Sequence, residues 1–345
     1  MKRLLYHPGY PGQTFFQRII DRDNLGYAMR CAIRAKPNDP EVLNIIYNKE
    51  YYIDELHHML VSRQFHTSKY TVFKKNDNGK DRIIYKLPFC PDRIVHWAVL
   101  LQIGPVLISK FINQSYSSIP GKGPLCCMMQ VCKDLRKYPD ETFYCLKIDI
   151  RKFYPSINHE ILKDMYLKIF KDMDLLYIIF DVIDSVDESE GIPIGNYLSQ
   201  FSGNLYLTGF DHWIKEEKHV RFYYRYMDDM VFLSDSKDKL RELFDDAKTY
   251  LNDKLKLTLK PNHRIFPVDD GLDYVGYVIY HDHVLTRKRI ANGYKNCVNR
   301  CMNQHALTQH DLSQYYAYKG FIQHANSYNL HKRYGYELEH KFDLI

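Results

Sequence analysis

The chain has 345 residues, of which 45% are hydrophobic and 26% are charged, as in an ordinary globular protein. This composition excludes a largely disordered chain, and the length allows one multi-lobed unit or two to three domains. The formal net charge of +6 and the 30 tyrosines permit a nucleic-acid partner without requiring one.

The cysteines and the apolar segments narrow the class of protein. The eight cysteines form no pair of CxxC motifs and have no histidine at zinc-finger spacing, so we expect reduced thiols. Residues 1–12 lack the apolar core of a signal peptide. The longest apolar run, residues 94–112, is too polar to span a bilayer, because four residues interrupt it: His96, Gln102, Pro105 and Lys110. These features predict a cytoplasmic protein that has no membrane partner.

The first third of the chain combines helical segments with one β-hairpin. Up to about residue 65, turn signals alternate with helical stretches such as residues 41–52. From residue 70 to residue 87, short β-prone runs flank an Asn-Gly pair that is typical of a two-residue turn. Basic residues crowd this predicted hairpin: Lys74, Lys75, Lys80, Arg82 and Lys86.

The middle of the chain predicts strands that end in aspartates. Residues 143–150 form a buried strand ending at Asp149, and Asn158 can cap the helix that follows. Two β-prone arms flank Met227-Asp228-Asp229, which predicts a hairpin with carboxylates at its bend. A helix from about residue 235 and a strand at residues 255–259 come next. The order is that of a split βαβ fold, followed by a basic helical lobe from residue 287.

The three aspartates suit phosphoryl transfer. Nucleotide addition needs two divalent cations about 3.5–4 Å apart, held by carboxylates from different strands. Asp149 at a strand end and Asp228-Asp229 at a bend can supply them. A single aspartate at a turn is commonplace, so the prediction depends on the complete set and on its sequence context.

That context resembles a known enzyme family. The string Tyr226-Met227-Asp228-Asp229 resembles motif C of reverse transcriptases, and residues 146–157, LKIDIRKFYPSI, resemble motif A. The resemblance extends from about Lys80 to Tyr328. It implies an RNA-directed DNA polymerase with two Mg²⁺ ions, for which Mn²⁺ can substitute, held by Asp149, Ile150, Asp228 and Asp229.

The resemblance also implies a fold and a domain order. The expected class is α+β, a right-hand polymerase with fingers, a split βαβ (ferredoxin-like or RRM-like) palm and a helical thumb. The expected boundaries are an N-terminal extension at 1–65, fingers at 66–145, palm at 146–285 and thumb at 286–345. A segment at about 158–190 is expected to contribute to the fingers.

Further resemblances imply roles at the nucleotide site. Tyr154 lies five positions after Asp149, where the family carries an aromatic gate that excludes a ribose 2′-hydroxyl. Arg82, in preference to Arg93, is expected to clamp the triphosphate, because a guanidinium offers forked donors. Residues 115–123 resemble the family's second motif, whose small residues let the backbone approach nucleic acid.

Motif B carries the signal of a subtype. Residues 191–200, GIPIGNYLSQ, have Ile194 where most relatives carry Gln and Gln200 where they carry Pro. The IGNxxSQ form is similar to reverse transcriptases of diversity-generating retroelements, which copy a template RNA with errors at adenines. Ile194, Gly195 and Gln200 are therefore expected beside the nucleotide, and neutral variation at Ile194 is the alternative.

The C-terminal part completes the resemblance. Tyr274, Val275, Gly276 and Tyr277 resemble the primer grip. Lys260 or Arg264 stands where motif D carries a basic residue, and the sequence does not decide between them. Seven residues near the C-terminus resemble the thumb of the same retroelement group: Ser313, Tyr315, Gly320, His324, Asn326, Tyr328 and Leu330.

Other readings remain open. A retron enzyme is disfavoured because the NAxxH and VTG strings are missing, and a group II intron enzyme because no maturase extension follows the thumb-like segment. A phage-defence enzyme of the abortive-infection type has a similar palm. A non-catalytic RNA-binding protein with a polymerase fold belongs to a different class, and the complete carboxylate set argues against it.

The resemblance finally implies partners and a setting. The partners are a template RNA encoded nearby, a cDNA or primer strand, deoxynucleoside triphosphates and a small basic accessory protein that assembles as a barrel. The expected setting is a prokaryotic cell or its phage.

Overall fold

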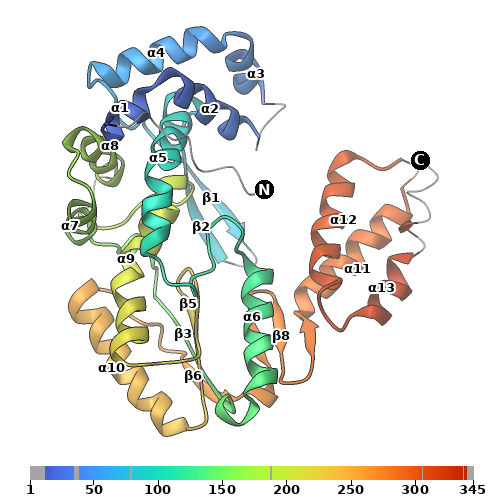
Figure 1. The fold of residues 1–345 in the computed structure, drawn as a ribbon. Coiled ribbons are helices and arrows are strands. Elements are labelled where there is room, and N and C mark those ends of the chain that lie inside the picture. Colours follow the sequence, from blue (N-terminus) through green and yellow to red (C-terminus); the bar gives the residue numbers. More distant parts are fainter. Residues whose placement is uncertain are drawn as a thin grey trace. The chain divides into compact units, whose positions relative to one another are not determined.

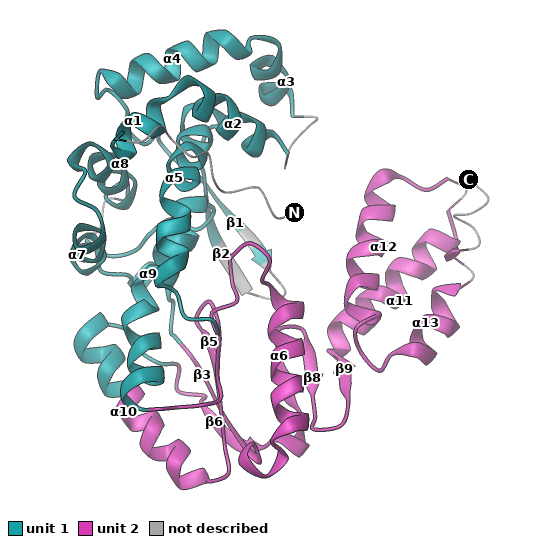
Figure 2. Ribbon diagram, viewed as in Figure 1, with its two compact units in different colours: residues 1–113, 150–218, 248–259 teal, residues 114–149, 219–247, 260–345 magenta. Residues whose placement is uncertain are grey.

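The computed structural model describes residues 12–34, 39–77, 80–186, 189–304, 306–336 and 338–339, apart from five side chains of the first hairpin: Lys75, Asp77, Lys80, Asp81 and Arg82. The chain divides into two compact units (Figure 2). Unit 1 comprises residues 1–113, 150–218 and 248–259, and unit 2 comprises residues 114–149, 219–247 and 260–345. Helices and antiparallel sheets both contribute, which confirms the expected mixture of helix and sheet.

Unit 1 is mainly helical (Figure 1). Its central helix is α5 (Ile94–Lys110), which is buried on most sides and packs against α2 and α9. The other helices are α1 (Phe15–Ile20), α2 (Arg22–Ile33), α3 (Pro40–Tyr47), α4 (Lys49–Val61), α7 (His159–Ile169), α8 (Met173–Ile183) and α9 (Tyr197–His212). Short helical turns form at Phe89–Arg93, Tyr154–Ser156 and Trp213–Glu217.

Side chains at the helix ends explain several of these boundaries. Asn158 accepts a hydrogen bond from the backbone N–H of Ile161 at 3.1 Å, which confirms the predicted cap of α7. The helical stretch expected at residues 41–52 is present but is interrupted, because Asn48 leaves the helical conformation and separates α3 from α4. Its side-chain amide donates to the carbonyl oxygen of Asn44 at 3.0 Å, a local bond that competes with the helix.

The only sheet seen in the described part of unit 1 is the predicted hairpin. Strands β1 (Thr71–Asp77) and β2 (Lys80–Lys86) are antiparallel, with Asp77 opposite Lys80. Asn78 and Gly79, the predicted turn residues, lie outside the described residues. The pairing of the two strands confirms the hairpin.

Unit 2 contains a four-stranded antiparallel sheet in the order β4-β5-β3-β6. Its strands are β3 (Tyr144–Asp149), β4 (Tyr223–Tyr226), β5 (Asp229–Ser234) and β6 (Arg264–Pro267). Central strand β3 buries Cys145, Leu146 and Ile148 completely or nearly so, as its apolar run predicts.

The strand predicted at residues 255–259 is wrong. Helix α10 (Lys237–Leu255) continues to Leu255, and the fourth strand begins only at Arg264. The alternation Leu255-Lys256-Leu257 has a β-like period, but Leu251 and Leu255 also continue the apolar stripe of the helix. Lys256, at φ 55°, follows the helix in the left-handed conformation that often ends helices.

Helix α6 (Pro124–Lys137) joins this sheet to a second, three-stranded sheet within unit 2 (Figure 2). The second sheet contains β7 (Leu272–Tyr274), β8 (Tyr277–Ile279) and β9 (Val284–Thr286). Apolar side chains of α6, including Val131 and Leu135, share one core with residues of both sheets. This shared core fixes α6 against β8 and β9.

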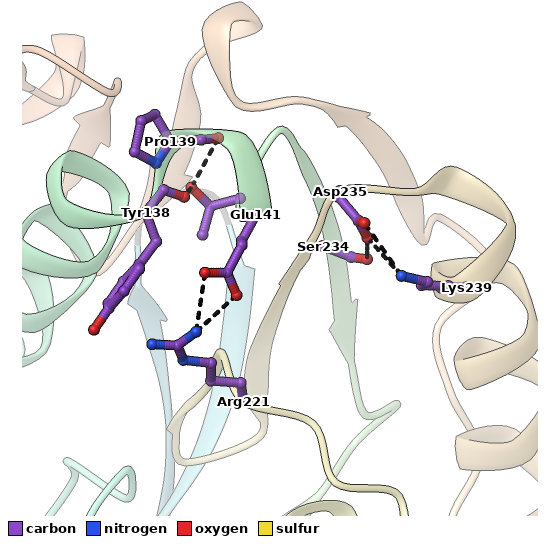
Figure 3. Close-up of polar contacts among 8 residues, drawn as sticks. Tyr138, Pro139, Glu141, Arg221, Ser234, Asp235 and Lys239 are labelled. Atoms are coloured by element: carbon purple, nitrogen blue, oxygen red, sulfur yellow. Dashed lines mark hydrogen bonds and ion pairs between the residues drawn. The ribbon is translucent and has the colours of Figure 1, made fainter.

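Polar contacts surround the sheet ends that are remote from Asp149 and Asp229 (Figure 3). Arg221 pairs with Glu141 at 2.7 Å, and its guanidinium carbon lies 3.9 Å from the centroid of the Tyr138 ring. Lys239 pairs with Asp235 just after β5. Exposed pairs of this kind are worth about 0.2–1 kcal/mol each, so the apolar core contributes most of the stability.

The C-terminal segment is helical, as predicted. It contains α11 (Lys288–Met302), α12 (Gln309–Ile322) and α13 (Tyr328–Tyr334), which have a small core of their own. All eight cysteines are free thiols, as expected. Within the described residues, no helix is both long enough and apolar enough to cross a membrane.

Candidate functional site

The three predicted catalytic aspartates lie in unit 2, on neighbouring strands of the four-stranded sheet. Asp149 ends β3 and is the register partner of Asp229, which begins β5. Tyr226 pairs with Asp229 across the turn, so Met227 and Asp228 form a two-residue connection between β4 and β5. The sheet therefore brings the C-terminal end of β3 and the bend of the β4–β5 hairpin together.

The bend of this hairpin is conformationally unusual. Met227 has φ 56°, a left-handed conformation that few non-glycine residues adopt. The fully buried Arg225 donates a hydrogen bond from Nη1 to the carbonyl oxygen of Met227 at 3.0 Å. This bond holds the turn that carries Asp228.

Two lysines neutralise part of the negative charge at the site. Lys260 Nζ lies 2.6 Å from Asp149 Oδ2, and Lys147 Nζ lies 3.1 Å from Asp229 Oδ2. The other oxygen, Oδ1, of each aspartate is buried and has no hydrogen-bond partner. Two carboxylate oxygens therefore remain available for a cation.

The electrostatics of the hairpin favour binding of positive charge. Burial, together with repulsion from the Asp149 carboxylate, raises the pKa of Asp228. Burial also raises the pKa of Asp229 to about 6, although Lys147 opposes this shift. Both shifts mean that burial disfavours the charged form of each carboxylate, a cost that a bound cation would offset.

The donor set fits a hard divalent cation, because it consists of carboxylate oxygens, two of which are unpartnered. In the arrangement described, however, no three His, Cys, Asp or Glu side chains are gathered closely enough to hold a metal ion. The lysines occupy one oxygen of each aspartate in this arrangement.

The expected primer-grip residues form a tight hairpin between β7 and β8. Tyr274 pairs with Tyr277, and the two-residue turn between them has positive φ at both Val275 (44°) and Gly276 (96°). Both tyrosine side chains are buried. A Cβ on Gly276 would lie 2.8 Å from a ring carbon of Phe321, so this position requires glycine.

Buried Tyr274 connects this hairpin to the aspartates. Its hydroxyl is shared between the carbonyl oxygens of Tyr224 (3.3 Å) and Asp229 (3.2 Å), which belong to β4 and β5. Lys147 makes a second connection, because its ammonium also donates to the carbonyl oxygen of Asp273 at 2.7 Å. The β7–β8 hairpin thus supports the strand that carries Asp229.

The expected nucleotide-site residues lie in unit 1. The apolar side chain of Ile194 cannot form a hydrogen bond. Its carbonyl oxygen accepts one from the Tyr85 N–H of β2 at 3.3 Å. Gly195 has φ 123°, and a Cβ there would come within 3.0 Å of the Tyr85 carbonyl oxygen. Gln200 lies in the first turn of α9. The loop that carries Ile194 and Gly195 is therefore attached to the β1–β2 hairpin.

Tyr154 is attached to the beginning of the same loop. Its carbonyl oxygen accepts a hydrogen bond from Ile192 N–H at 3.0 Å, and its ring is half-buried beside Phe153. A Cβ on Gly203 of α9 would meet the Phe153 ring at 3.2 Å and the Tyr154 ring at 3.5 Å. Gly203 thus makes room for both rings.

Two expected residues remain to be placed. Ile150 is buried and bridges Leu259, so its backbone carbonyl is the only part that could contact a metal. Arg82 of β2 lies opposite Lys75 of β1 in the strand register. Its side chain lies outside the described part of the chain.

The sequence reasoning missed Lys147, Arg225, Gly203 and the inward direction of Tyr274. A charged residue within a buried strand was the available signal for Lys147 and Arg225, because such residues need a partner. Lys260 was considered together with Arg264. Lys260 contacts Asp149, whereas Arg264 is exposed and lies over the Phe266 ring.

Comparison with known proteins decides the family. Residues 73–279, more than half of the chain, match the family described as reverse transcriptase (RNA-dependent DNA polymerase). The chain belongs to this family. The matched region includes every expected site residue from Arg82 to Tyr277.

Individual relatives are distant. Protein YkfC of Escherichia coli (strain K12) is 23% identical over 270 residues, which cover 66% of this chain and 69% of that protein. The structure of apo telomerase from Candida tropicalis has a TM-score of 0.50 at 13% identity and covers 73% of this chain. A truncated form of that telomerase gives a TM-score of 0.48 at 17% identity and covers 65% of this chain.

The chain spans 53% and 55% of the two telomerase chains, respectively. At this identity, the similarity to telomerase concerns the fold alone. The chain therefore shares its fold with the apo telomerase structure that has the TM-score of 0.50.

Proposed function

We propose that the protein copies a template RNA into cDNA by two-metal nucleotidyl transfer at Asp149, Asp228 and Asp229. The supporting observation is the pairing of Asp149 with Asp229 on adjacent strands, each with a buried carboxylate oxygen that has no partner. Membership of the reverse transcriptase family supports the reaction type.

Asp149, Asp228 and Asp229 would hold Mg²⁺, or Mn²⁺ in its place, together with the backbone carbonyl of Ile150. When bound, such ions activate the attacking 3′-oxygen and stabilise charge on the leaving pyrophosphate. Arg225 and Tyr274 keep the hairpin in position through the carbonyl oxygens of Met227 and Asp229.

Lys260 is the better candidate for the basic residue of motif D. Its ammonium lies 2.6 Å from Asp149 Oδ2, so it adds a positive charge directly beside the aspartate site. Among the residues that the structure describes, Arg264 contacts the Phe266 ring and no aspartate. We therefore assign to Lys260 the support of the leaving pyrophosphate.

In this proposal the lobes keep the boundaries expected from the resemblance: extension at 1–65, fingers at 66–145, palm at 146–285 with finger residues at about 158–190, and thumb at 286–345. The four-stranded sheet with the aspartates would belong to the palm, the β1–β2 hairpin to the fingers, and α11–α13 to the thumb. The β7–β8 hairpin would act as the primer grip through its turn, because both tyrosine side chains are buried.

Unit 1 would supply nucleotide selection. Tyr154 is proposed as the gate against ribonucleotides, Arg82 as a triphosphate ligand, and Ile194, Gly195 and Gln200 as neighbours of the nascent base pair. The attachment of Tyr154 to Ile192, and of Ile194 to Tyr85, supports this grouping because it ties all these segments together within unit 1.

The motif B form supports a diversity-generating retroelement as the source of the enzyme. The copying would then be error-prone at template adenines and serve mutagenic retrohoming. The corresponding partners are a template RNA, a primer or cDNA strand, deoxynucleoside triphosphates and a small basic barrel-forming accessory protein.

Primer extension tests the proposal. The purified chain is given a primer annealed to an RNA template, deoxynucleoside triphosphates and Mg²⁺ or Mn²⁺, and the cDNA is sequenced. We expect extension that a chelator abolishes, with substitutions concentrated opposite adenines. Complete absence of synthesis with and without the accessory protein would refute the polymerase activity, and uniform fidelity would refute the mutagenic subtype alone.

A further inference from the structure

A groove of about 550 Å³ lies on unit 2, separate from the residues of the aspartate site. One wall is the C-terminal half of α6, with Met129, Lys133, Arg136 and Lys137. The opposite wall contains His324, after α12, and Asn326. A volume of this size is typical of sites that take small ligands or single groups of larger ones.

The helical wall presents one continuous face. Met129, Lys133, Arg136 and Lys137 are spaced by four, seven and eight residues from the first, so they align along one side of α6. All four side chains are exposed, Met129 to 59%. The face therefore combines an apolar contact with three positive charges.

The opposite wall is anchored to the sheet. Asn326 N–H donates to the carbonyl oxygen of Val284 at 2.7 Å, and Val284 N–H donates to Asn326 Oδ1 at 2.9 Å. This reciprocal pair fixes the segment with His324 against β9. Because Val284 and α6 share one core, both walls of the groove are held by packed structure.

The charges of the groove lack compensation. Within the described part of the chain, neither Lys133 nor Arg136 has a carboxylate partner, whereas Arg221 and Lys239, elsewhere in unit 2, are paired (Figure 3). Lys137 lies over the Tyr138 ring, with Nζ 5.0 Å from its centroid. Unpaired positive charges beside the fixed apolar side chains that line the groove suit a phosphate-bearing chain.

We propose that this groove binds the sugar-phosphate backbone of single-stranded RNA, at a second site beyond the polymerase centre. Lys133 and Arg136 contact phosphates, His324 offers a ring for base stacking, and Met129 packs against ribose. The choice of RNA depends on the proposed function, in which the template is RNA. A basic protein partner is disfavoured, because it would meet like charge.

Fluorescence anisotropy with labelled single-stranded RNA of mixed sequence tests the site. The double variant Lys133→Gln/Arg136→Gln is compared with Lys248→Gln/Lys254→Gln, an equal charge change at exposed positions of α10. We expect the groove variant to lose at least about tenfold in affinity. The slope of log affinity against log salt should fall by about 1.4, since each phosphate contact of a single strand contributes about 0.7.

The control pair should retain both affinity and slope. The charge-conserving variant Lys133→Arg/Arg136→Lys should bind RNA like the wild type. Circular dichroism should show that all variants melt at the same temperature as the wild type. Equal losses in the groove and control variants would overturn the proposal in favour of general charge attraction. Unchanged RNA binding accompanied by loss of poly-glutamate binding would overturn it in favour of an acidic protein partner.

Binding and synthesis are measured separately, so the two proposals can fail independently. On a short, pre-annealed primer and template, the groove variant should extend DNA like the wild type. Absence of extension by the wild type would remove the polymerase proposal, and the anisotropy comparison would still decide whether the groove binds RNA. Unaltered affinity and salt slope in the groove variant would refute the groove, even in an active polymerase.

Discussion

The aspartate hairpin of unit 2 and the loop at residues 191–196 of unit 1 are held in place in different ways. Side chains fix the hairpin: Arg225, Tyr274 and Lys147 contact its carbonyl and carboxylate oxygens. The loop is held mainly through its backbone: it has backbone hydrogen bonds and glycines with positive φ, and the His159 ring bonds the Gly191 carbonyl oxygen at 2.7 Å. One loop side chain, Asn196, also donates to the Tyr70 hydroxyl at 3.1 Å. Changes to single side chains should therefore control reaction rate in unit 2 and nucleotide selection in unit 1.

The largest expected effect comes from Asp228→Asn. The substitution keeps the shape of the side chain and removes a metal-binding charge, so DNA synthesis should fall by about 100-fold or more. Stability should be equal or higher, because a buried charge that Asp149 repels is removed. Primer extension and urea unfolding of the same preparation measure both effects.

Asp235→Asn is the matched control for this prediction. Asp235 lies just beyond the other end of β5 and pairs with Lys239 on the surface (Figure 3). Its substitution should change stability by less than about 1 kcal/mol and leave synthesis unchanged. Equal synthesis by Asp228→Asn and the wild type would remove the aspartate hairpin from the reaction.

Acid should lower the stability of unit 1 more than that of unit 2. His96 of α5 is fully buried, and burial lowers its pKa from 6.5 to about 4. The unfolded chain takes up the proton first as pH falls, so stability is complete above about pH 6.5 and decreases toward pH 4. The maximum loss is about 3 kcal/mol, at 1.36 kcal/mol for each pKa unit.

Hydrogen exchange at pH 7.5 and pH 5 measures this loss locally. The helices around α5 should lose protection at pH 5, and the β3–β5 pair of unit 2 should lose less. His96→Leu removes the titrating group, so its exchange should depend less on pH in unit 1. Equal pH dependence of this variant and the wild type would show that other groups control acid stability.

The selective role of unit 1 is tested most directly at Tyr154. Tyr154→Ala opens space beside Phe153, and incorporation of ribonucleotides relative to deoxynucleotides should rise by about 10- to 200-fold. The ratio of kcat/KM values for the two nucleotides is the measurement. Tyr154→Phe keeps the ring and should leave the ratio unchanged, whereas an unmoved ratio in both variants would make the ring purely structural.

A smaller effect is expected in unit 2 from Tyr274→Phe. The variant removes the hydroxyl that bonds the carbonyl oxygens of Tyr224 and Asp229, while the buried ring remains. Loss of a neutral hydrogen bond is worth about 0.5–1.5 kcal/mol, so kcat should fall by roughly 2- to 13-fold. Tyr277→Phe is the control and should keep full kcat. Tyr277 is also buried, but in the described structure its hydroxyl makes no bond to the β4–β5 hairpin that carries Asp228 and Asp229.

The sequence predicted the parts of this site whose residues lie close together in the chain. The strand ending at Asp149, the acidic hairpin bend and the cap at Asn158 all depend on local pattern, and the structure contains each of them. The position of Tyr154 relative to Asp149 followed from a motif. These features require no knowledge of distant contacts.

Contacts between distant segments were not predictable in this way. Lys147 reaches Asp229 only because β5 pairs with β3. Lys260 reaches Asp149 because its backbone N–H donates to the Asp149 carbonyl oxygen at 2.9 Å, a contact between segments far apart in the chain. The inward direction of Tyr274 depends on the core shared by α6 and two sheets. The false strand at residues 255–259 arose because a helical stripe and a β alternation coincide over Leu255 and Leu257.

The smallest expected effect concerns fidelity and the side chain of Ile194. Most relatives carry Gln at this position, and a Gln amide can hydrogen-bond near the incoming nucleotide or the template, whereas Ile offers only shape. The Ile194 carbonyl already accepts from Tyr85 N–H, so the loop keeps its backbone anchor whichever side chain is present. Ile194→Gln should therefore fold and extend normally.

One neutral hydrogen bond contributes about 0.5–1.5 kcal/mol, so Ile194→Gln should lower misincorporation by roughly 2- to 13-fold. The decrease should be greatest opposite template adenine, because that is where the proposed subtype makes its errors. Sequencing of cDNA made on one template RNA compares this variant with the wild type and with Ile194→Val, which keeps the site apolar and should keep the error frequency. If Gln and Val gave the same adenine error frequency at equal extension, selection in unit 1 would depend on loop position and not on this side chain.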